Sequence, residues 1–275
     1  MIDLLKADLK RAVKDKLFIV LSIIAVVFAF ITPLLYKFIF EIMEVDVESM
    51  QELDAILGTI NAKTMFFGAF SLSNNFGLIL PLFVAIIICK DFSSGTIRNK
   101  IICGKSRASI YFSLLITCGI LICFFILAHA ILTLLISLMF FDYQQTEFTA
   151  SDFGYLMASI GLEFIIYLFV SVILTFFITS MKNMGLSIVC YFAFSFLMII
   201  IGSVTQTASM FVDVDTVTFK FLEFFNVSNP FMGVAIGSGV SYDIKTILYI
   251  ILPNVIFSVI IVILGLIIFK KRDLK

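Results

Sequence analysis

Charged residues are scarce in this sequence. Asp, Glu, Lys and Arg make up 14% of its 275 residues, whereas hydrophobic residues make up 61% and phenylalanine alone occurs 33 times. A soluble domain of this composition would have too little polar surface to cover its core. The composition therefore excludes a soluble protein and indicates a single integral membrane domain, residues 1–275.

Motifs for redox, metal or covalent chemistry are also missing. The five cysteines show no CxxC pairing, and no group of His, Cys and carboxylate residues has the spacing of a metal or nucleophile site. We therefore expect free thiols, no metal, no cofactor and no catalytic residue in this chain.

One nucleotide-binding motif is present only in part. Gly104, Lys105 and Ser106 match the end of a Walker A P-loop, but the position of its first glycine holds Asn99. An apolar span precedes the segment, whereas a P-loop follows a buried strand of a soluble α/β domain. We therefore expect no nucleotide binding by this chain.

Long apolar runs are abundant. A helix needs roughly 20 apolar residues to cross a bilayer, and six runs reach that length, at about 17–36, 67–89, 109–141, 155–180, 184–202 and 246–269. They predict an all-α fold of six transmembrane helices. Residues 203–245 are the longest predicted outer loop.

The basic residues orient these spans. With both termini in the cytoplasm, fifteen of the nineteen Lys and Arg residues fall in inner segments, as the positive-inside rule requires. Residues 1–16 carry apolar side chains on one helical face and four cations on another, which predicts an interfacial helix on the inner leaflet. A simple charged anchor is the alternative. The apolar positions are Ile2, Leu5, Leu9, Ala12 and Val13.

A polar, basic segment separates the second and third spans. In residues 90–107, Ser93 or Ser94 can cap a short helix whose Ile97 and Ile101 share one face. Gly104 can end that helix, and Ser106 can cap the third span. The segment therefore predicts a short cytoplasmic helix attached to two spans.

Three motifs of the chain resemble the type-2 ABC-transporter permease family. They are Asp91-Phe92-Ser93-Ser94-Gly95-Thr96-Ile97 after the second span, Ser228-Asn229-Pro230-Phe231 before the last, and Gly265…Phe269-Lys270-Lys271-Arg272-Asp273 at the end. Asp91 stands where the family usually has Glu, which shortens the reach of the carboxylate.

The resemblance implies the membrane-spanning subunit of an ATP-driven exporter in the bacterial cytoplasmic membrane. Such a permease pairs with a second permease, identical or related, and docks a separate subunit that holds ATP and Mg. The helix between the second and third spans would be the coupling helix that docks on this ATPase. Residues 229–238 would form short or re-entrant helices on the outer face. The implied coupling residues are Asp91, Phe92, Gly95, Thr96, Ile97, Arg98 and Ile101.

Four polar residues inside the predicted spans are candidates for the transport pathway. Asn74 and Asn75 should face protein or water, because amides are costly in lipid. Glu163 is either a functional carboxylate inside the membrane or a carboxylate that reaches the outer interface. His129 is either a proton relay or a neutral histidine bonded to a neighbouring helix. Polar residues at four-residue steps along the fourth span, from Ser159 to Thr179, favour a packing seam.

The sequence defines the substrate less closely than it defines the class of transporter. The Phe- and Ile-rich spans suit a hydrophobic or amphipathic cargo, such as an antimicrobial peptide or toxin, and nothing in the chain indicates a nucleic-acid partner. An ATP-independent secondary transporter or channel, and a membrane sensor or scaffold, are the alternatives. A secondary transporter would show intramembrane acids and broken helices.

Overall fold

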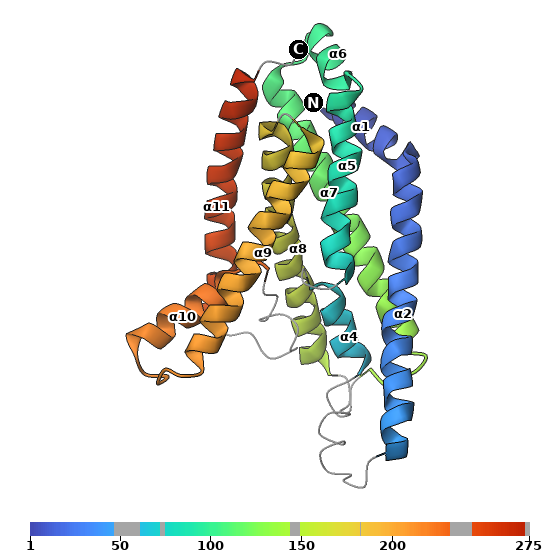
Figure 1. Cartoon of the computed structure of the whole chain (residues 1–275), viewed down its shortest axis with the longest axis vertical. Coiled ribbons are helices and arrows are strands. Elements are labelled where there is room, and N and C mark those ends of the chain that lie inside the picture. The colour runs from blue at the N-terminus through green and yellow to red at the C-terminus, as the bar shows by residue number, and fades with distance from the viewer. Residues whose placement is uncertain (47–60, 72–74, 144–148, 182, 232–243, 273–275) are drawn as a thin grey trace.

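The computed structural model describes residues 1–46, 61–71, 75–143, 149–181, 183–231 and 244–272, and these parts are helical (Figure 1). Within them, six helices are long and apolar enough to cross a membrane, which confirms the predicted multi-pass, all-α class. They are α2 (Lys16–Asp46), α5 (Asn75–Ser93), α7 (Arg107–Ser137), α8 (Ala150–Ser180), α9 (Met184–Ser209) and α11 (Ile244–Lys271). The shorter helices are α1 (Ile2–Lys14), α4 (Ala62–Ala69), α6 (Thr96–Ile102) and α10 (Val217–Ser228).

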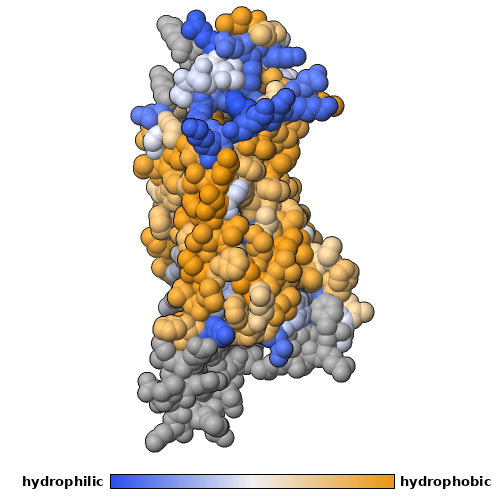
Figure 2. Space-filling model, turned by 90° about the vertical axis from the view of Figure 1, so that its right-hand side faces the viewer, coloured by the Kyte–Doolittle hydropathy of each residue, from blue (hydrophilic) through white to orange (hydrophobic). Residues whose placement is uncertain are grey.

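The long helices form a bundle with a central group and a peripheral group. Helices α5, α7 and α8 occupy the centre, while α2 and α11 lie on opposite flanks (Figure 1). Half or more of each central span is buried, against 22% of α2 and 17% of α9 and α11. The peripheral helices therefore present their apolar side chains outward, as the hydrophobic belt in Figure 2 shows, and lipid is the surrounding that suits them.

The two ends of the bundle differ. The N-terminus, the C-terminal end and α6 lie at one end, and α10 lies towards the other (Figure 1). Hydrophilic residues crowd the first end above the hydrophobic belt (Figure 2). We call it the α6 end.

The second span differs from its predicted start at residue 67. Residues 67–69 belong to the separate helix α4, and the span begins at Asn75. Asn61 and Thr64 form a reciprocal capping box that starts α4, and its C-cap is Phe70. The polar run from Ser71 explains the interruption, because Ser and Asn side chains compete for backbone hydrogen bonds and favour helix ends.

The fifth span is longer than predicted. Helix α9 continues to Ser209, beyond the predicted end at residue 202. Ser203, Thr205 and Thr207 each donate a hydroxyl hydrogen bond to a backbone carbonyl four residues earlier, at 2.9 to 3.0 Å. Hydroxyls satisfied within the helix let it extend through a sequence that reads as polar.

The segment before α11 contains one described short helix, α10. Asn229 follows it, and its Nδ2 donates to the carbonyl of Met198 in α9 at 2.8 Å. Phe231 is buried beside it. The rest of the predicted re-entrant segment, residues 232–238, lies outside the described residues. The five cysteines are free, with Cys103 exposed.

Candidate functional site

The α6 end contains the segment predicted to couple the chain to a partner. Two glycines with left-handed backbone conformations set the limits of α6. Gly95 has φ +70° and accepts the first helical hydrogen bond, from Asn99 N at 3.0 Å. Gly104 has φ +77°. Its N–H donates to the carbonyl of Ile101, and the N–H of Lys105 donates to the carbonyl of Lys100. These two hydrogen bonds form a Schellman motif, which ends the helix. Side chains with a Cβ are disfavoured at both glycines.

The predicted serine cap of α6 is wrong. Gly95 occupies the N-cap, because Ser93 and Ser94 are used elsewhere. The Ser93 hydroxyl donates to the carbonyl of Lys90 at 3.1 Å, and Ser94 Oγ lies 2.7 Å from Thr96 Oγ1. The predicted cap of the third span is confirmed, since Ser106 Oγ accepts from Ser109 N at 3.2 Å.

Helix α6 has one buried and one exposed face. Ile97 is buried and Ile101 is packed against the core, as the shared face predicted. Arg98 and Asn99 are exposed. Ile102, which the sequence reasoning missed, is 72% exposed.

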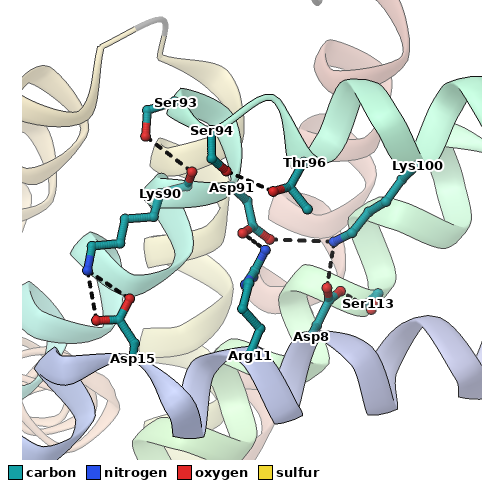
Figure 3. Close-up of polar contacts among 10 residues, drawn as sticks. All are labelled: Asp8, Arg11, Asp15, Lys90, Asp91, Ser93, Ser94, Thr96, Lys100 and Ser113. Atoms are coloured by element: carbon teal, nitrogen blue, oxygen red, sulfur yellow. Dashed lines mark hydrogen bonds and ion pairs between the residues drawn. The ribbon is translucent and has the colours of Figure 1, made fainter.

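Asp91, the predicted coupling carboxylate, is 1% exposed and points into the protein. It forms ion pairs with Arg11 of α1 and with Lys100 of α6, the latter at 3.5 Å. Lys100 Nζ also lies 2.6 Å from Asp8 Oδ1, and Asp8 Oδ2 accepts from the Ser113 hydroxyl at 2.6 Å. Figure 3 shows these side chains converging between α1 and the α5–α6 turn. Asp91 therefore links α6 to α5 and α1.

The ionisation of this cluster reflects its burial. Burial lowers the pKa of Lys100, although its hydrogen bond to Asp8 opposes the shift. Burial likewise lowers the pKa of Arg11, and the charges of Asp8 and Asp15 oppose that shift. Two carboxylates and two cations bring the net charge of the cluster close to zero, which is the condition under which buried charges are tolerated.

A second ion pair lies beside the cluster. Lys90 Nζ contacts both carboxylate oxygens of Asp15 at 2.7 Å (Figure 3). Asp15 Oδ1 also accepts a hydrogen bond from Leu17 N at 2.9 Å. Burial would raise the pKa of Asp15, but the hydrogen bonds from Lys90 and Leu17 outweigh burial and hold that pKa below its ordinary value. Asp15 thus joins the start of α2 to the end of α5.

Phe92 connects the same turn to the C-terminal segment. The ring centroids of Phe92 and Phe269 are 6.4 Å apart, in an edge-to-face arrangement. The guanidinium carbon of Arg272 lies 5.0 Å from the ring centroid of Phe92. Arg272 Nη1 donates to the carbonyl of Thr179 at 2.6 Å, in the last turn of α8. Arg107, at the start of α7, donates to the carbonyls of Lys270 and Arg272 at 2.7 Å. The C-terminal motif therefore ties α7, α8 and α11 to the α5–α6 turn.

The predicted coupling residues are brought together, but in two roles. Asp91, Phe92 and Ile97 hold the helix to the bundle, whereas Arg98 faces outward. Residues far away in the sequence complete the cluster, namely Asp8, Arg11, Lys100, Phe269 and Arg272. A displacement of α6 would thus act on α1 and α5 through Lys100, and on α11 through Phe92.

Of the four predicted pathway residues, His129 and Glu163 have described side chains. Asn74 lies outside the described residues, and Asn75 is the first residue of α5, with its side chain outside the description. His129 Nδ1–H donates to the carbonyl of Ala25 in α2 at 3.1 Å, and its ring lies 4.4 Å from that of Phe76. No described hydrogen bond or ion pair joins His129 to Glu163.

Glu163 is 4% exposed, so it does not reach the surface of the bundle. Within the described parts of the chain, its carboxyl forms no hydrogen bond or ion pair. One turn further along α8, the Tyr167 hydroxyl donates to the carbonyl of Phe70 at 2.6 Å, where α4 ends. All six members of the polar series from Ser159 to Thr179 are buried. Ser159 and Thr179 donate to carbonyls of their own helix at 2.8 Å, as expected of a packing seam.

The fold defines a multi-pass helical membrane protein with a polar cluster at one end of its bundle. No family model matches the chain, and no curated protein or solved structure is significantly similar to it. The function proposed below therefore rests on the geometry of the α6 end together with the resemblance of its motifs.

Proposed function

We propose that this chain is the membrane-spanning permease subunit of an ATP-driven ABC exporter in the bacterial cytoplasmic membrane. It works as a dimer with a second permease and docks a separate subunit that binds ATP and Mg. The observation that carries the proposal is the attachment of α6, a short helix with an exposed outer face whose Lys100 is bonded to Asp8 of α1 and to Asp91 of α5. The α6 end is then cytoplasmic, as the basic residues predict.

The geometry suggests how such a subunit transmits movement. Ile102, Arg98 and Asn99 provide the contact surface, and closure of the ATPase pair displaces α6. Because Asp91 is paired with Arg11 and Lys100, and Phe92 packs on Phe269, the displacement passes to α1 and α11 as well as to α5. Access to the pathway would change as these helices shift against the central ones. A hydrophobic or amphipathic cargo, such as an antimicrobial peptide or toxin, fits the apolar spans.

The proposal is tested by looking among the neighbouring genes for an ABC-type ATP-binding subunit, co-expressing it with the chain and reconstituting both in liposomes. We expect co-purification and ATP hydrolysis, both reduced about five- to thirtyfold by Ile102→Asp, since a buried interface contact of this kind is worth about 1–2 kcal/mol. Met139→Asp is the matched control, because Met139 is 75% exposed at the opposite end of α7. Equal effects of the two substitutions would contradict docking through α6.

A second candidate is an ATP-independent secondary transporter. The interruption between α4 and α5, together with the buried Glu163 one turn from Tyr167, is the combination expected of that class. Transport by the chain alone in liposomes under an ion gradient, abolished by Glu163→Gln, would support this candidate and refute the ABC proposal.

A further inference from the structure

Helix α1 carries three distinct faces. The face turned towards α7 is formed by Leu4, Asp8 and Ala12, which are 7%, 2% and 1% exposed. Lys6, Lys10 and Lys14 are spaced by four residues and therefore share a second face, which is exposed. Ile2 and Val13, 67% and 50% exposed, lie within about 20° of each other around the helix, beside Lys6.

The charges of α1 are divided between these faces. Asp8 is bonded to Lys100 and Ser113, Arg11 to Asp91, and Asp15, which follows the helix, to Lys90. In the described part of the chain, Lys6, Lys10 and Lys14 form no ion pair. Asp8 and Asp15 are thus paired within the protein, whereas Asp3 is exposed. With three exposed lysines against this one carboxylate, α1 presents a net positive, partly apolar surface to its surroundings.

The position of α1 places this surface at the edge of the hydrophobic belt. Helix α1 runs into α2 with Asp15 as the only residue between them. The first turns of α2 expose Ile19, Val20 and Ile23, which belong to a span that is apolar enough to lie in lipid. A bilayer around α2 therefore brings α1 to the level of the headgroups, with Ile2 and Val13 able to reach the acyl chains.

We propose that Lys6, Lys10 and Lys14 bind the phosphate groups of anionic phospholipids, and that this binding holds α1 against the α5–α6 turn. A row of lysines beside apolar side chains matches a leaflet, which offers phosphate and hydrocarbon at adjacent depths. On its inward side the same helix contacts Lys100 through Asp8 and Asp91 through Arg11. Because of these contacts, lipid binding to α1 should also stabilise α6 against local opening. The inference stands independently of the proposed ABC function.

The test is hydrogen exchange of the full chain in nanodiscs of phosphatidylcholine, with and without phosphatidylglycerol. We expect phosphatidylglycerol to slow exchange in α1 at least about tenfold and to slow exchange in α6 to a smaller extent, with both effects weakened by salt. The triple variant Lys6→Gln/Lys10→Gln/Lys14→Gln should lose the lipid effect. The triple Lys→Arg variant should keep it, which separates loss of charge from loss of folding.

The control removes two exposed cations at the same end, by Arg98→Gln with Lys105→Gln, and should leave the effect of phosphatidylglycerol on α1 intact. Equal exchange in the two lipid compositions would overturn the proposal. So would protection by phosphatidylglycerol that persists in the Gln variant or is lost in the Arg variant. Inorganic phosphate in phosphatidylcholine nanodiscs, at matched ionic strength, should not protect α1. Protection equal to that of phosphatidylglycerol would assign the site to free phosphate and refute a lipid site.

Discussion

The α6 end and the middle of the bundle are held together in different ways. At the α6 end, separate helices are joined by charges and rings, as in the contacts of Asp91 with Arg11 and of Phe92 with Phe269. In the middle, the Ser171 hydroxyl bonds to the carbonyl of Leu168 in its own helix, so α7 and α8 meet mainly through packing. The one carboxyl there, that of Glu163, has no described partner.

This difference matters for how movement could spread. Paired charges and ring contacts have defined partners, so moving one element of the α6 end must either move or break its neighbour. Packed interiors have low compressibility and respond mainly to a change of volume. Loss of charge should therefore be costly at the α6 end, whereas added volume should be costly in the bundle.

The largest effect is expected from Asp91→Asn. The substitution leaves Arg11 and Lys100 with Asp8 as their only carboxylate in the cluster, so two cations lose part of their compensation. Removing one member of a buried ion pair usually costs about 3–5 kcal/mol. We expect about 2–3 kcal/mol here, because Arg11 is 36% exposed and water screens part of its charge. The thermal unfolding midpoint in one detergent measures the loss.

Asp3→Asn is the control for that experiment. Asp3 is exposed on α1 and has no ion pair within the described residues, so its substitution should leave the midpoint nearly unchanged. If both variants shift the midpoint equally, the buried cluster does not stabilise the α6 end.

A smaller loss is expected when volume is added between α7 and α11. A Cβ at Gly265 would meet the Tyr111 hydroxyl, with Tyr111 Cζ at 3.1 Å and Phe176 Cδ2 at 3.3 Å. Tyr111 is fully buried against Phe269 and cannot easily move. Gly265→Ala should therefore destabilise the protein by about 1–2 kcal/mol, although alanine favours the helix.

The matched control is Gly161→Ala. Gly161 lies in α8, where an added Cβ meets no atom within 4 Å, so the gain in helix propensity should stabilise by up to about 1 kcal/mol. The two substitutions are chemically identical and should change the unfolding midpoint in opposite directions. A shift of the same sign at both sites would mean that Gly265 is not needed for the approach of α11 to α7.

The class and the spans could be predicted because length and apolarity are local properties. The end of α6 and the start of α7 were predictable too, since Gly104 and Ser106 are strong signals for a helix end and a helix start. The break before α5 had a signal in the polar run from Ser71, but an apolar stretch on either side favoured a continuous span.

The partners within the α6 end were not predictable. A single sequence does not indicate that Asp91 meets Arg11, or that Lys100 meets Asp8, because these pairs form between distant segments. Periodicity in α1 predicted an apolar face for the inner leaflet, and Ile2 and Val13 of that row are exposed. Leu5 and Leu9 are partly buried and Ala12 is buried. Periodicity did not indicate that the polar residue Asp8 is buried as well.

A still smaller effect is expected from Glu163→Gln. Since the Glu163 carboxyl has no described cation to lose, a neutral side chain of equal size should change the unfolding free energy by less than about 1 kcal/mol, in contrast to Asp91→Asn. Thermal unfolding of both variants in the same detergent makes the comparison. A large loss from Glu163→Gln would show that the carboxyl has a charged partner and that the middle of the bundle resembles the α6 end.

The smallest effect concerns pH and the pair between Asp15 and Lys90. Because the pKa of Asp15 is lower in the folded protein than in the unfolded chain, its contribution is fully present above the ordinary carboxyl pKa of about 3.9 and is lost as the pH falls through the lower, folded pKa. Lys90 is 45% exposed, so the contribution should be only about 0.2–1 kcal/mol. Hydrogen exchange at the junction of α1 and α2, corrected for intrinsic rates, should become faster as the pH falls. This increase should be smaller in the Asp15→Asn variant than in the unsubstituted protein. Asn can still accept the hydrogen bond from Leu17 but cannot pair with Lys90, so identical acid profiles of the two proteins would show that the ion pair contributes nothing to this junction.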